Sequence, residues 1–374
     1  MLKPNDRIGI LGGGQLGRML AMAATRLGLR TIILCPDENC PAAIVADTHI
    51  VADYEDEAGL AALAEAARVV TYEFENVPAA SVASLTRLGV HVAPGAKPLS
   101  IAQDRLNEKE FVRSLGGRTP DFYAVETLED LRAGLAITGT PAILKTRRLG
   151  YDGKGQTRIG TDTDNLDQTW DAAIAHAWAE VGARPSILEA FVPFRCEISV
   201  IAARGVPGPD GTAPIAMYDP PKNDHRSGIL WRSSVPAPVG TALIDDAKAM
   251  TRAMMEALDY VGVVGVEFFV LEDETLMVNE FAPRVHNSGH WTEAACAISQ
   301  FENHIRAVAG WPLGDPARHS NTQMENLIGE DVRAWHDWLC APDVLVNLYG
   351  KQEIRPGRKM GHVTRIMWKS EGDH

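Results

Sequence analysis

The hydrophobic positions early in the chain alternate between short apolar runs and stretches of helical period. Residues 7–13 form an apolar run ending in glycines, and the next stretch has its apolar side chains on one helical stripe, at Leu16, Met19, Leu20, Ala23 and Leu27. Further apolar runs follow at 30–35, 67–74 and 90–95. Strands that alternate with helices predict βαβ units, so we expect a small doubly wound α/β domain here.

The rest of the chain mixes helices with shorter strands. Ser100–Gln103 fits a capping box and predicts a helix that begins there and continues to about Leu115. Short strands and loops then extend to about residue 194, and apolar positions at helical spacing predict a helix at Thr241–Leu258. We therefore expect α/β and α+β parts in one chain.

Two apolar segments around an acidic turn, within residues 263–281, predict a β-hairpin. If the turn is centred between Asp273 and Glu274, Glu267 lies directly opposite Glu280, with Cβ atoms roughly 4.5–5.5 Å apart. Two carboxylates that close repel each other unless a proton or a cation lies between them. The hydrophobic neighbours indicate that the hairpin is covered on both faces, where uncompensated charge is costly.

This carboxylate pair predicts a cation site. Few, hard oxygen ligands that leave room for water and phosphate favour Mg²⁺ over a closed structural metal site. The loop that follows adds four polar side chains within seven residues, Arg284, His286, Asn287 and His290. A cation next to an anion pocket is typical of phosphate transfer. The alternative is that both glutamates are solvated edge residues in another register.

Composition limits the class of protein. The 374 residues predict two or three domains, and 45% hydrophobic with 23% charged residues is ordinary for a globular protein. The net charge of −13 argues against a nucleic-acid partner. Five cysteines without CxxC spacing predict reduced thiols. Since we find neither a signal peptide nor a membrane-length apolar run, we expect a cytoplasmic protein without a membrane partner.

A glycine motif follows the first strand at Gly12, Gly14 and Gly17. In a Rossmann oxidoreductase this motif binds a dinucleotide, but the acidic residue expected after the second strand is poorly matched, because Asp37 lies beyond it in a polar loop. Two interpretations stay open: a backbone-amide nest for an anionic or polar ligand, or close packing of the helix on the strand.

A second glycine-rich segment follows a strand that ends at Lys145. Its glycines allow backbone amides to approach phosphate oxygens, and the lysine supplies a point charge. It is not a Walker A loop, because its Gly-Lys pair is followed by Gly-Gln; an ordinary hairpin tip is the alternative.

The segment from Glu189 to Val192 is suited to cross between two domains, where its backbone would bind a nucleobase. Glu197 is suited to bind a ribose hydroxyl. No function is assigned to the isolated histidines His49, His91 and His176, and His225 is expected in a polar loop.

Five motifs together resemble the N5-carboxyaminoimidazole ribonucleotide synthetase family, ATP-grasp ligases of bacterial and fungal purine synthesis. They are GGGQLGRM, TYEFENVP, GYDGKGQ, VNEFAPRVHNSGHWT and RPGRKMGH, and the resemblance extends from about residue 7 to residue 363. The resemblance implies an N-terminal doubly wound, Rossmann-like domain over 1–102 and an ATP-grasp region over 103–313, with a small lid at about 122–190. A C-terminal segment over 314–374 would complete the larger mixed domain and the substrate phosphate site.

The resemblance also implies roles for individual residues. ATP contacts are implied for Arg105, Lys145, Gly150, Tyr151, Asp152, Gly153, Lys154, Gly155, Gln156, Glu189, Ala190, Phe191, Val192, Glu197, His225, Asn279 and Glu280. Glu267 and Glu280 would bind Mg²⁺ or Mn²⁺. Contacts to 5-aminoimidazole ribonucleotide are implied for Gln15, Glu73, Tyr151, Asp152, Arg284, Lys351 and Arg358. The implied catalytic residues are Arg284, His286 and Asn287.

The implied reaction joins ATP, bicarbonate and the ribonucleotide to give N5-carboxyaminoimidazole ribonucleotide, ADP and phosphate through carboxyphosphate. Arg284 would hold bicarbonate, and His286 would handle a proton on either bicarbonate or the attacking amine. The family further implies a homodimer and a hand-off of product to the mutase of the next step. The alternatives are a formate-dependent glycinamide ribonucleotide transformylase, a Rossmann oxidoreductase, and a non-catalytic nucleotide-binding regulator.

Overall fold

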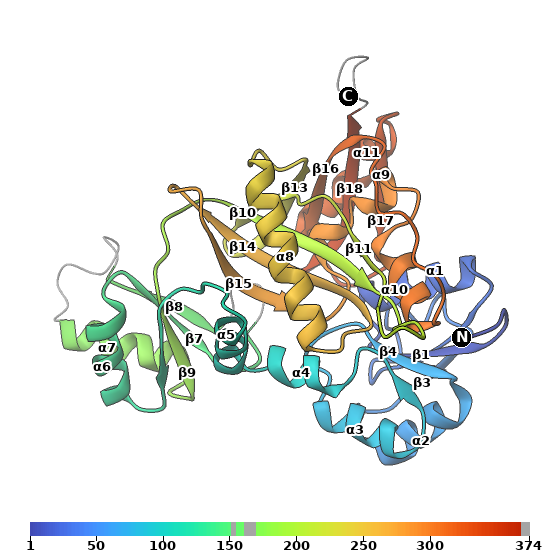
Figure 1. Ribbon diagram of the computed structural model, residues 1–374, viewed down its shortest axis with the longest axis horizontal. Helices are drawn as coiled ribbons and strands as arrows, with labels where there is room; N and C mark the ends of the chain where they lie inside the picture. Colours follow the sequence, from blue (N-terminus) through green and yellow to red (C-terminus); the bar gives the residue numbers. More distant parts are fainter. Residues whose placement is uncertain (151–154, 161–169, 368–374) are drawn as a thin grey trace.

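Three sheets with their helices make up the part of the chain that the structure describes, residues 1–150, 155–160 and 170–367 of this computed structural model. Figure 1 shows the N-terminal sheet in blue at the lower right and a four-stranded sheet in green at the left. A nine-stranded sheet lies between them and continues to the C-terminal strands in orange and red. This arrangement matches the expected combination of α/β and α+β parts.

The N-terminal sheet is entirely parallel, with the strand order β3-β2-β1-β4-β5. Buried apolar residues of α1 pack on one face of the sheet, and those of α2 and α3 pack on the other. The predicted doubly wound domain is therefore confirmed. Its elements are β1 (Arg7–Leu11), α1 (Gln15–Arg26), β2 (Arg30–Leu34), β3 (Thr48–Ile50), α2 (Glu57–Ala66), β4 (Val69–Tyr72), α3 (Ala79–Arg87) and β5 (His91–Val92).

The helix predicted from Ser100 is wrong. Two helices occupy this region, α4 (Ala96–Ala102) and α5 (Arg105–Ser114). Ser100 lies inside α4, where its hydroxyl donates to the carbonyl of Lys97. The residue that caps α5 is Asp104, whose Oδ1 accepts from the amide of Leu106 at 3.1 Å. The break between the helices places Arg105 at the first position of α5.

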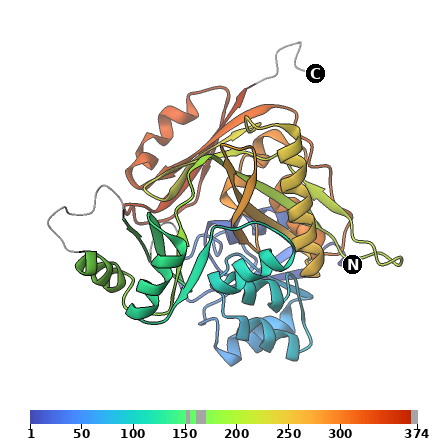
Figure 2. The same ribbon diagram turned by 60° about the vertical axis from the view of Figure 1, so that its left-hand side comes forward.

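The four-stranded sheet has the antiparallel order β6-β9-β7-β8. Helices α6 and α7 pack on the sheet through a separate small core that includes Leu131, Leu144 and Ile174. Figure 2 shows these green elements as a unit to one side of the large sheet. They are β6 (Phe122–Val125), α6 (Leu128–Thr138), β7 (Ala142–Thr146), β8 (Gln156–Ile159), α7 (Trp170–Glu180) and β9 (Ser186–Ala190).

The large sheet has the order β15-β14-β10-β12-β13-β16-β18-β17, with β11 pairing beside β10. The predicted helix at Thr241–Leu258 is confirmed as α8 (Thr241–Ala257), whose apolar side chains pack on β10 and β14. No helix among the described residues is both long and apolar enough to cross a membrane. The strands are β10 (Phe194–Arg204), β11 (Ile215–Met217), β12 (Lys222–Arg226), β13 (Ile229–Val235), β14 (Gly262–Leu271), β15 (Leu276–Ala282), β16 (Asn321–Ile328), β17 (Val344–Leu348) and β18 (Lys359–Met367).

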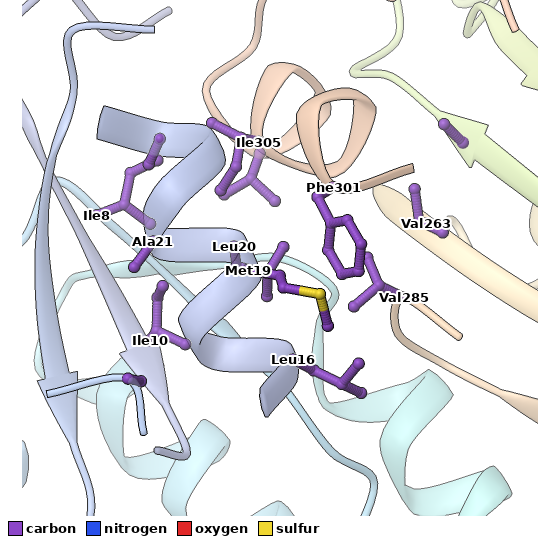
Figure 3. Packing of buried hydrophobic residues seen from close by; sticks show 14 of the residues in the cluster. Ile8, Ile10, Leu16, Met19, Leu20, Ala21, Val263, Val285, Phe301 and Ile305 are labelled. Carbon is purple, nitrogen blue, oxygen red and sulfur yellow. The ribbon is translucent and has the colours of Figure 1, made fainter. Parts of the chain in front are cut away.

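One hydrophobic cluster joins the N-terminal sheet to the large sheet. Figure 3 shows Leu16, Met19 and Leu20 of α1 facing Phe301 and Ile305 of α10 (Gln300–Val308). All five side chains are almost fully buried. Because close-packed interfaces resist sliding, this contact fixes the glycine loop before α1 relative to the β14–β15 hairpin. The remaining short elements are η1 (Asn287–Gly289), α9 (Thr292–Ala295), η2 (Gly329–Ala334) and α11 (Trp335–Leu339).

Candidate active site

The predicted pairing of Glu267 with Glu280 is confirmed. These residues are direct partners in the antiparallel pair of β14 and β15. The turn is not centred where the sequence suggested, since Val270 pairs with Leu276. A register shift next to Glu267 leaves Asn279 as an extra residue in β15, and this bulge restores the glutamate pair.

The two glutamates of the hairpin differ in charge state. Glu267 is buried, and burial together with the charge of Glu280 raises its pKa to about 8. Burial would also raise the pKa of Glu280, but the guanidinium of Arg105, 2.9 Å away, helps to lower it to about 2. Glu267 thus keeps a proton near neutral pH when no cation lies beside it. The buried carboxylate of Glu267 and the partly exposed carboxylate of Glu280 together offer oxygen ligands that fit a hard divalent cation, which would replace that proton.

A second buried carboxylate, Glu189 at the end of β9, binds two lysines. Its Oε2 lies 2.8 Å from Nζ of Lys145, and its Oε1 lies 3.7 Å from Nζ of Lys109. Burial opposes ionisation of Glu189, yet the two lysines and Arg105 lower its pKa to about 2. Lys109 also donates to the carbonyl of Asn279 in the bulge. The lysines therefore connect the four-stranded sheet to the carboxylate hairpin.

Glu197 and His225 lie beside this region on neighbouring strands. The expectation that His225 lies in a polar loop is wrong, because it belongs to β12, which pairs with β10. Its Nδ1 is 2.8 Å from Oε2 of Glu197. Burial lowers the pKa of His225, but Glu197 more than offsets this effect and raises it. Glu197 thus has a partner in the protein in addition to any ribose hydroxyl.

The glycine motif encloses a carboxylate. The amides of Gly14 and Gly17 both donate to Glu73, which follows β4. A Cβ on Gly12, whose φ is +112°, would lie 2.3 Å from Cγ of Glu73. The amide nest exists but is filled by an internal acid, and close packing holds at Gly17, where a Cβ would lie 2.8 Å from the carbonyl oxygen of Gly12. Burial raises the pKa of Glu73 despite the two amides.

The loop after β15 is held by several polar contacts. Arg284 forms an ion pair with Glu75, and its Nη1 donates to the carbonyl of Val285 at 3.1 Å. Nε2 of His286 lies 3.5 Å from Oε1 of Glu267. Burial and the charge of Arg284 lower the pKa of His286 to about 3, so the imidazole is neutral. Asn287 accepts from Nδ2 of Asn326 through Oδ1 at 2.8 Å, which fixes its amide.

The basic C-terminal segment connects β17 to β18. Nζ of Lys351 donates to the carbonyl of Lys359 at 2.7 Å and lies 5.5 Å from the ring centroid of Tyr349. Nη1 of Arg358 donates to the carbonyl of Glu353 at 3.0 Å. Lys351 and Arg358, two of the implied ribonucleotide contacts, thus lie in one connection at the edge of the large sheet.

The remaining predicted positions lie on the glycine loop, the four-stranded sheet and the crossing to β10. Gln15 is the first residue of α1. Gln156 is the first residue of β8 and pairs with Lys145, and the preceding Gly155 has a φ of +69°. Ala190, Phe191 and Val192 span the end of β9 and the crossing. Gly150 ends one described segment, and four predicted residues, Tyr151, Asp152, Gly153 and Lys154, lie outside the described residues.

The sequence interpretation missed Lys109 and Glu75. Lys109 lies four residues after Arg105 in α5, so helical spacing places both side chains on one face. Glu75 lies two residues after Glu73, and its pKa falls below its usual value because Arg284 outweighs the effect of burial. Both residues could have been noticed as charged neighbours of predicted site residues.

Comparison with known proteins gives consistent matches over most of the chain. A ribonucleotide synthetase preATP-grasp domain matches residues 5–103, an ATP-grasp domain matches 110–301, and a phosphoribosylaminoimidazole carboxylase C-terminal domain matches 322–371. The N5-carboxyaminoimidazole ribonucleotide synthase of Brucella melitensis is 53% identical, with 98% of this chain and 97% of the relative covered.

Solved structures agree with these matches. A crystal structure of an ADP complex of N5-carboxyaminoimidazole ribonucleotide synthetase has a TM-score of 0.91 and 37% identity, covering 98% of this chain and 94% of the other. An Aspergillus clavatus N5-carboxyaminoimidazole synthase in complex with ADP and 5-aminoimidazole ribonucleotide has a TM-score of 0.87 and 29% identity, covering 97% and 94%.

Proposed function

This chain belongs to the N5-carboxyaminoimidazole ribonucleotide synthases of the ATP-grasp ligases, and we propose that it uses ATP to carboxylate 5-aminoimidazole ribonucleotide with bicarbonate. The products would be N5-carboxyaminoimidazole ribonucleotide, ADP and phosphate, within purine biosynthesis. The observation that carries this proposal is the pairing of Glu267 with Glu280 beside a cluster of lysine and arginine side chains. A site of this kind can bind a nucleoside triphosphate together with a divalent cation.

ATP would bind between the four-stranded sheet and the β14–β15 hairpin. Arg105 and Lys145 would bind phosphate oxygens, and Glu267 with Glu280 would hold Mg²⁺ or Mn²⁺. When bound, the ion offsets negative charge on the transferring phosphoryl group. The buried Oε1 of Glu189 has no hydrogen-bond partner among the described residues. This acceptor supports recognition of an amino group, such as that of adenine, near the crossing to β10.

The remaining nucleotide contacts follow the segments that surround this position. Phosphates would also approach the backbone of Gly150, Gly155 and Gln156, together with the four predicted residues outside the described ranges. The base would lie along Ala190, Phe191 and Val192. The ribose would contact Glu197, with His225 behind it, and Asn279 would lie beside the phosphates. The Glu197–His225 pair supports this placement because it fixes a carboxylate for a hydroxyl.

The ribonucleotide would bind on the opposite side of the hairpin. Gln15 and Glu73 belong to the glycine loop and its buried acid, while Arg284 lies next to Glu75. Lys351 and Arg358 would bind the 5′-phosphate, since they bring positive charge to one connection. The packing of α1 against α10 supports this proposal by fixing the glycine loop relative to the hairpin.

Arg284 would hold bicarbonate and then carboxyphosphate between the two substrates. Bicarbonate is a weak nucleophile, so positioning it in line with the γ-phosphoryl group is the main task of the site. His286 would handle a proton on either bicarbonate or the attacking amine, and its neutral imidazole supports this role. Its Nδ1 lies within hydrogen-bond distance of the hydroxyl and the amide of Ser288, which orients the ring, and its Nε2 lies 3.5 Å from Oε1 of Glu267. Asn287 would belong to the same pocket.

We extend the proposal to the organisation of the protein. We propose that the four-stranded sheet is a lid. The chain would then divide into residues 1–102, residues 103–313 with the lid at about 122–190, and residues 314–374. A closed lid would protect carboxyphosphate from water until the amine attacks. We further propose that the protein is a cytoplasmic homodimer. Its product would pass to the mutase that catalyses the next step.

A product assay with labelled bicarbonate tests the function. We expect ADP formation that requires both bicarbonate and 5-aminoimidazole ribonucleotide, with label appearing in the carboxylated product. Comparable turnover with formate and glycinamide ribonucleotide would instead indicate a transformylase. ATP hydrolysis at a rate that depends on neither bicarbonate nor 5-aminoimidazole ribonucleotide would contradict the proposal.

A further inference from the structure

Three side chains with metal-binding atoms meet at the carboxyl edge of the N-terminal sheet. Cys35 directly follows β2, and His49 lies on β3, where it pairs with Ile33 of β2. Cys40 follows the polar loop 36–39 and lies beside Cys35 and His49. One ligand atom of each residue lies within 4.8 Å of the other two. The parallel strands thus bring together two thiols and an imidazole that the proposed reaction does not use.

The spacing within this cluster suits a tetrahedral ion. Sγ of Cys40 is 3.8 Å from Nε2 of His49. In a tetrahedral zinc site with Zn–S of about 2.3 Å and Zn–N of about 2.0–2.1 Å, the sulfur and nitrogen are roughly 3.6 Å apart. The same Nε2 lies 3.3 Å from the carbonyl oxygen of Cys35, a contact that a bound ion would replace. The sulfurs of Cys35 and Cys40 are inside the protein, with residue exposures of 5% and 2%.

The glycine loop leaves room for both sulfurs. A Cβ on Gly13 would lie 2.3 Å from Sγ of Cys40 and 2.6 Å from Sγ of Cys35. The carbonyl of Gly13 also accepts from the amide of Ala42 at 2.9 Å, which holds the segment after Cys40 against the loop. A glycine at position 13 therefore allows the two thiols to converge directly behind the loop that encloses Glu73.

We propose that Cys35, Cys40 and His49 form a binding site for one Zn²⁺ ion, with water as the fourth ligand. Thiolate and imidazole ligands select a thiophilic ion such as Zn²⁺ and disfavour Mg²⁺, which prefers oxygen. Binding would release the two thiol protons to solvent, because the thiolate is the metal ligand. The site is separate from the Glu267–Glu280 pair in residues and in ligand chemistry.

A bound ion would stabilise the back of the proposed ribonucleotide site. It would connect the end of β2, the loop 36–39 and β3, and these segments contact the glycine loop through Gly13. Since the ligands come from neighbouring strands, the ion would act as a cross-link within the N-terminal sheet. Its expected effects are a higher melting temperature and a better ordered glycine loop.

Cobalt(II) titration of the full-length, fully reduced protein tests the site. We expect a thiolate-to-cobalt charge-transfer band that saturates at one ion per chain and disappears when Zn²⁺ is added. Cys40→Ser should abolish the band, and His49→Gln should weaken binding at least about tenfold. His49→Gln changes a half-buried residue, so it keeps the test valid if Cys40→Ser fails to fold. Zn²⁺ should raise the melting temperature of the wild type and not that of either variant.

Cys340→Ser is the matched control. Cys340 has a histidine partner at a similar distance, 3.9 Å from Nδ1 of His336, but it is exposed and belongs to no three-ligand group among the described residues. This variant should keep the full band. A wild-type protein without the band, or a band that is lost in Cys340→Ser and kept in Cys40→Ser, would overturn the proposal. A Cys35–Cys40 disulfide with no metal uptake by the reduced protein would instead indicate a redox pair.

Discussion

Glu73 and Glu189 are both buried acids, with residue exposures of 6% and 2%, yet their surroundings shift their pKa values in opposite directions. Glu73 is bound by two backbone amides, and burial raises its pKa. Glu189 lies between Lys109 and Lys145, and these cations lower its pKa to about 2 against the effect of burial. Burial alone therefore does not set the pKa of a carboxyl group here, because a directly bound cation outweighs the effect of burial at Glu189.

This difference matches the two sides of the proposed reaction. On the nucleotide side, the ion pairs of Glu189 hold the two lysines in place before phosphate arrives, although burial lowers the pKa of Lys109. On the ribonucleotide side, burial raises the pKa of Glu73, and its two carboxyl oxygens accept from backbone amides, so its position is fixed before a substrate binds. The comparison can be tested by removing charge on each side with the smallest possible change of shape.

The largest effect is expected for Glu280→Ala. This change removes a proposed metal ligand and leaves Arg105 without its partner at 2.9 Å. We expect kcat/KM to fall at least about 100-fold, because charge stabilisation of the transferring phosphoryl group is lost. Mg·ATP binding, measured by calorimetry, should weaken as well. Glu325→Ala removes the partly buried partner of Arg232 in the same sheet and serves as the control, which should keep its activity. Near-normal activity of the Glu280 variant would remove the metal assignment.

Among the effects on stability, the largest is expected for Glu189→Gln. It leaves Lys109 and Lys145 buried without a counter-charge, and breaking a buried ion pair costs about 3–5 kcal/mol. Because the pKa of Glu189 is lowered to about 2, its stabilisation is complete above the unfolded pKa and is lost as pH falls toward 2. Chemical denaturation between pH 7 and pH 3 measures this. The variant should show less loss of stability on acidification than the wild type, and an equal loss would contradict the assignment.

Glu73→Gln should cost less than Glu189→Gln, about 1–3 kcal/mol. The change turns one acceptor of the Gly14 and Gly17 amides into a donor, so one buried amide loses its partner. No buried lysine is left unpaired by this change. The same denaturation experiment on both variants gives the comparison directly. If Glu73→Gln were the more destabilising substitution, the two acids would not differ as their surroundings indicate.

The sequence could predict the parts of this molecule that depend on local pattern. The parallel N-terminal sheet follows from alternating strands and helices, and the pairing of Glu267 with Glu280 follows from period-two alternation across a short turn. The bulge at Asn279 could not be predicted, because the off-centre turn that requires it depends on the conformation of a few turn residues. The helix boundary at Asp104 was missed because an earlier serine also fits the capping pattern.

Long-range partners explain the other misses. Arg284 and Glu75 are 209 residues apart in the chain, and Glu73 reaches Gly17 over 56 residues. Neither pairing has a periodic signal, because both depend on how α1 packs against α10 and on how β4 lies beside β1. The motifs therefore suggest which residues to propose for the site, while the charge partners that shift their pKa values could be found only from the fold.

The smallest effect among these variants is expected for Lys351→Ala, at the far end of the ribonucleotide side. Lys351 lies in the connection between β17 and β18, where it touches the backbone of Lys359 and the ring of Tyr349. A contact to a phosphate remote from the reacting atoms stabilises the ground state and the transition state equally, so its loss raises KM and leaves kcat nearly unchanged. We expect KM for the ribonucleotide to rise about tenfold, corresponding to roughly 1–2 kcal/mol for one charge-assisted hydrogen bond. KM for ATP should stay constant, which separates this side of the site from the Glu189 side. Initial rates with each substrate varied in turn would measure this, and a fall in kcat at unchanged KM would place Lys351 at the reacting atoms instead.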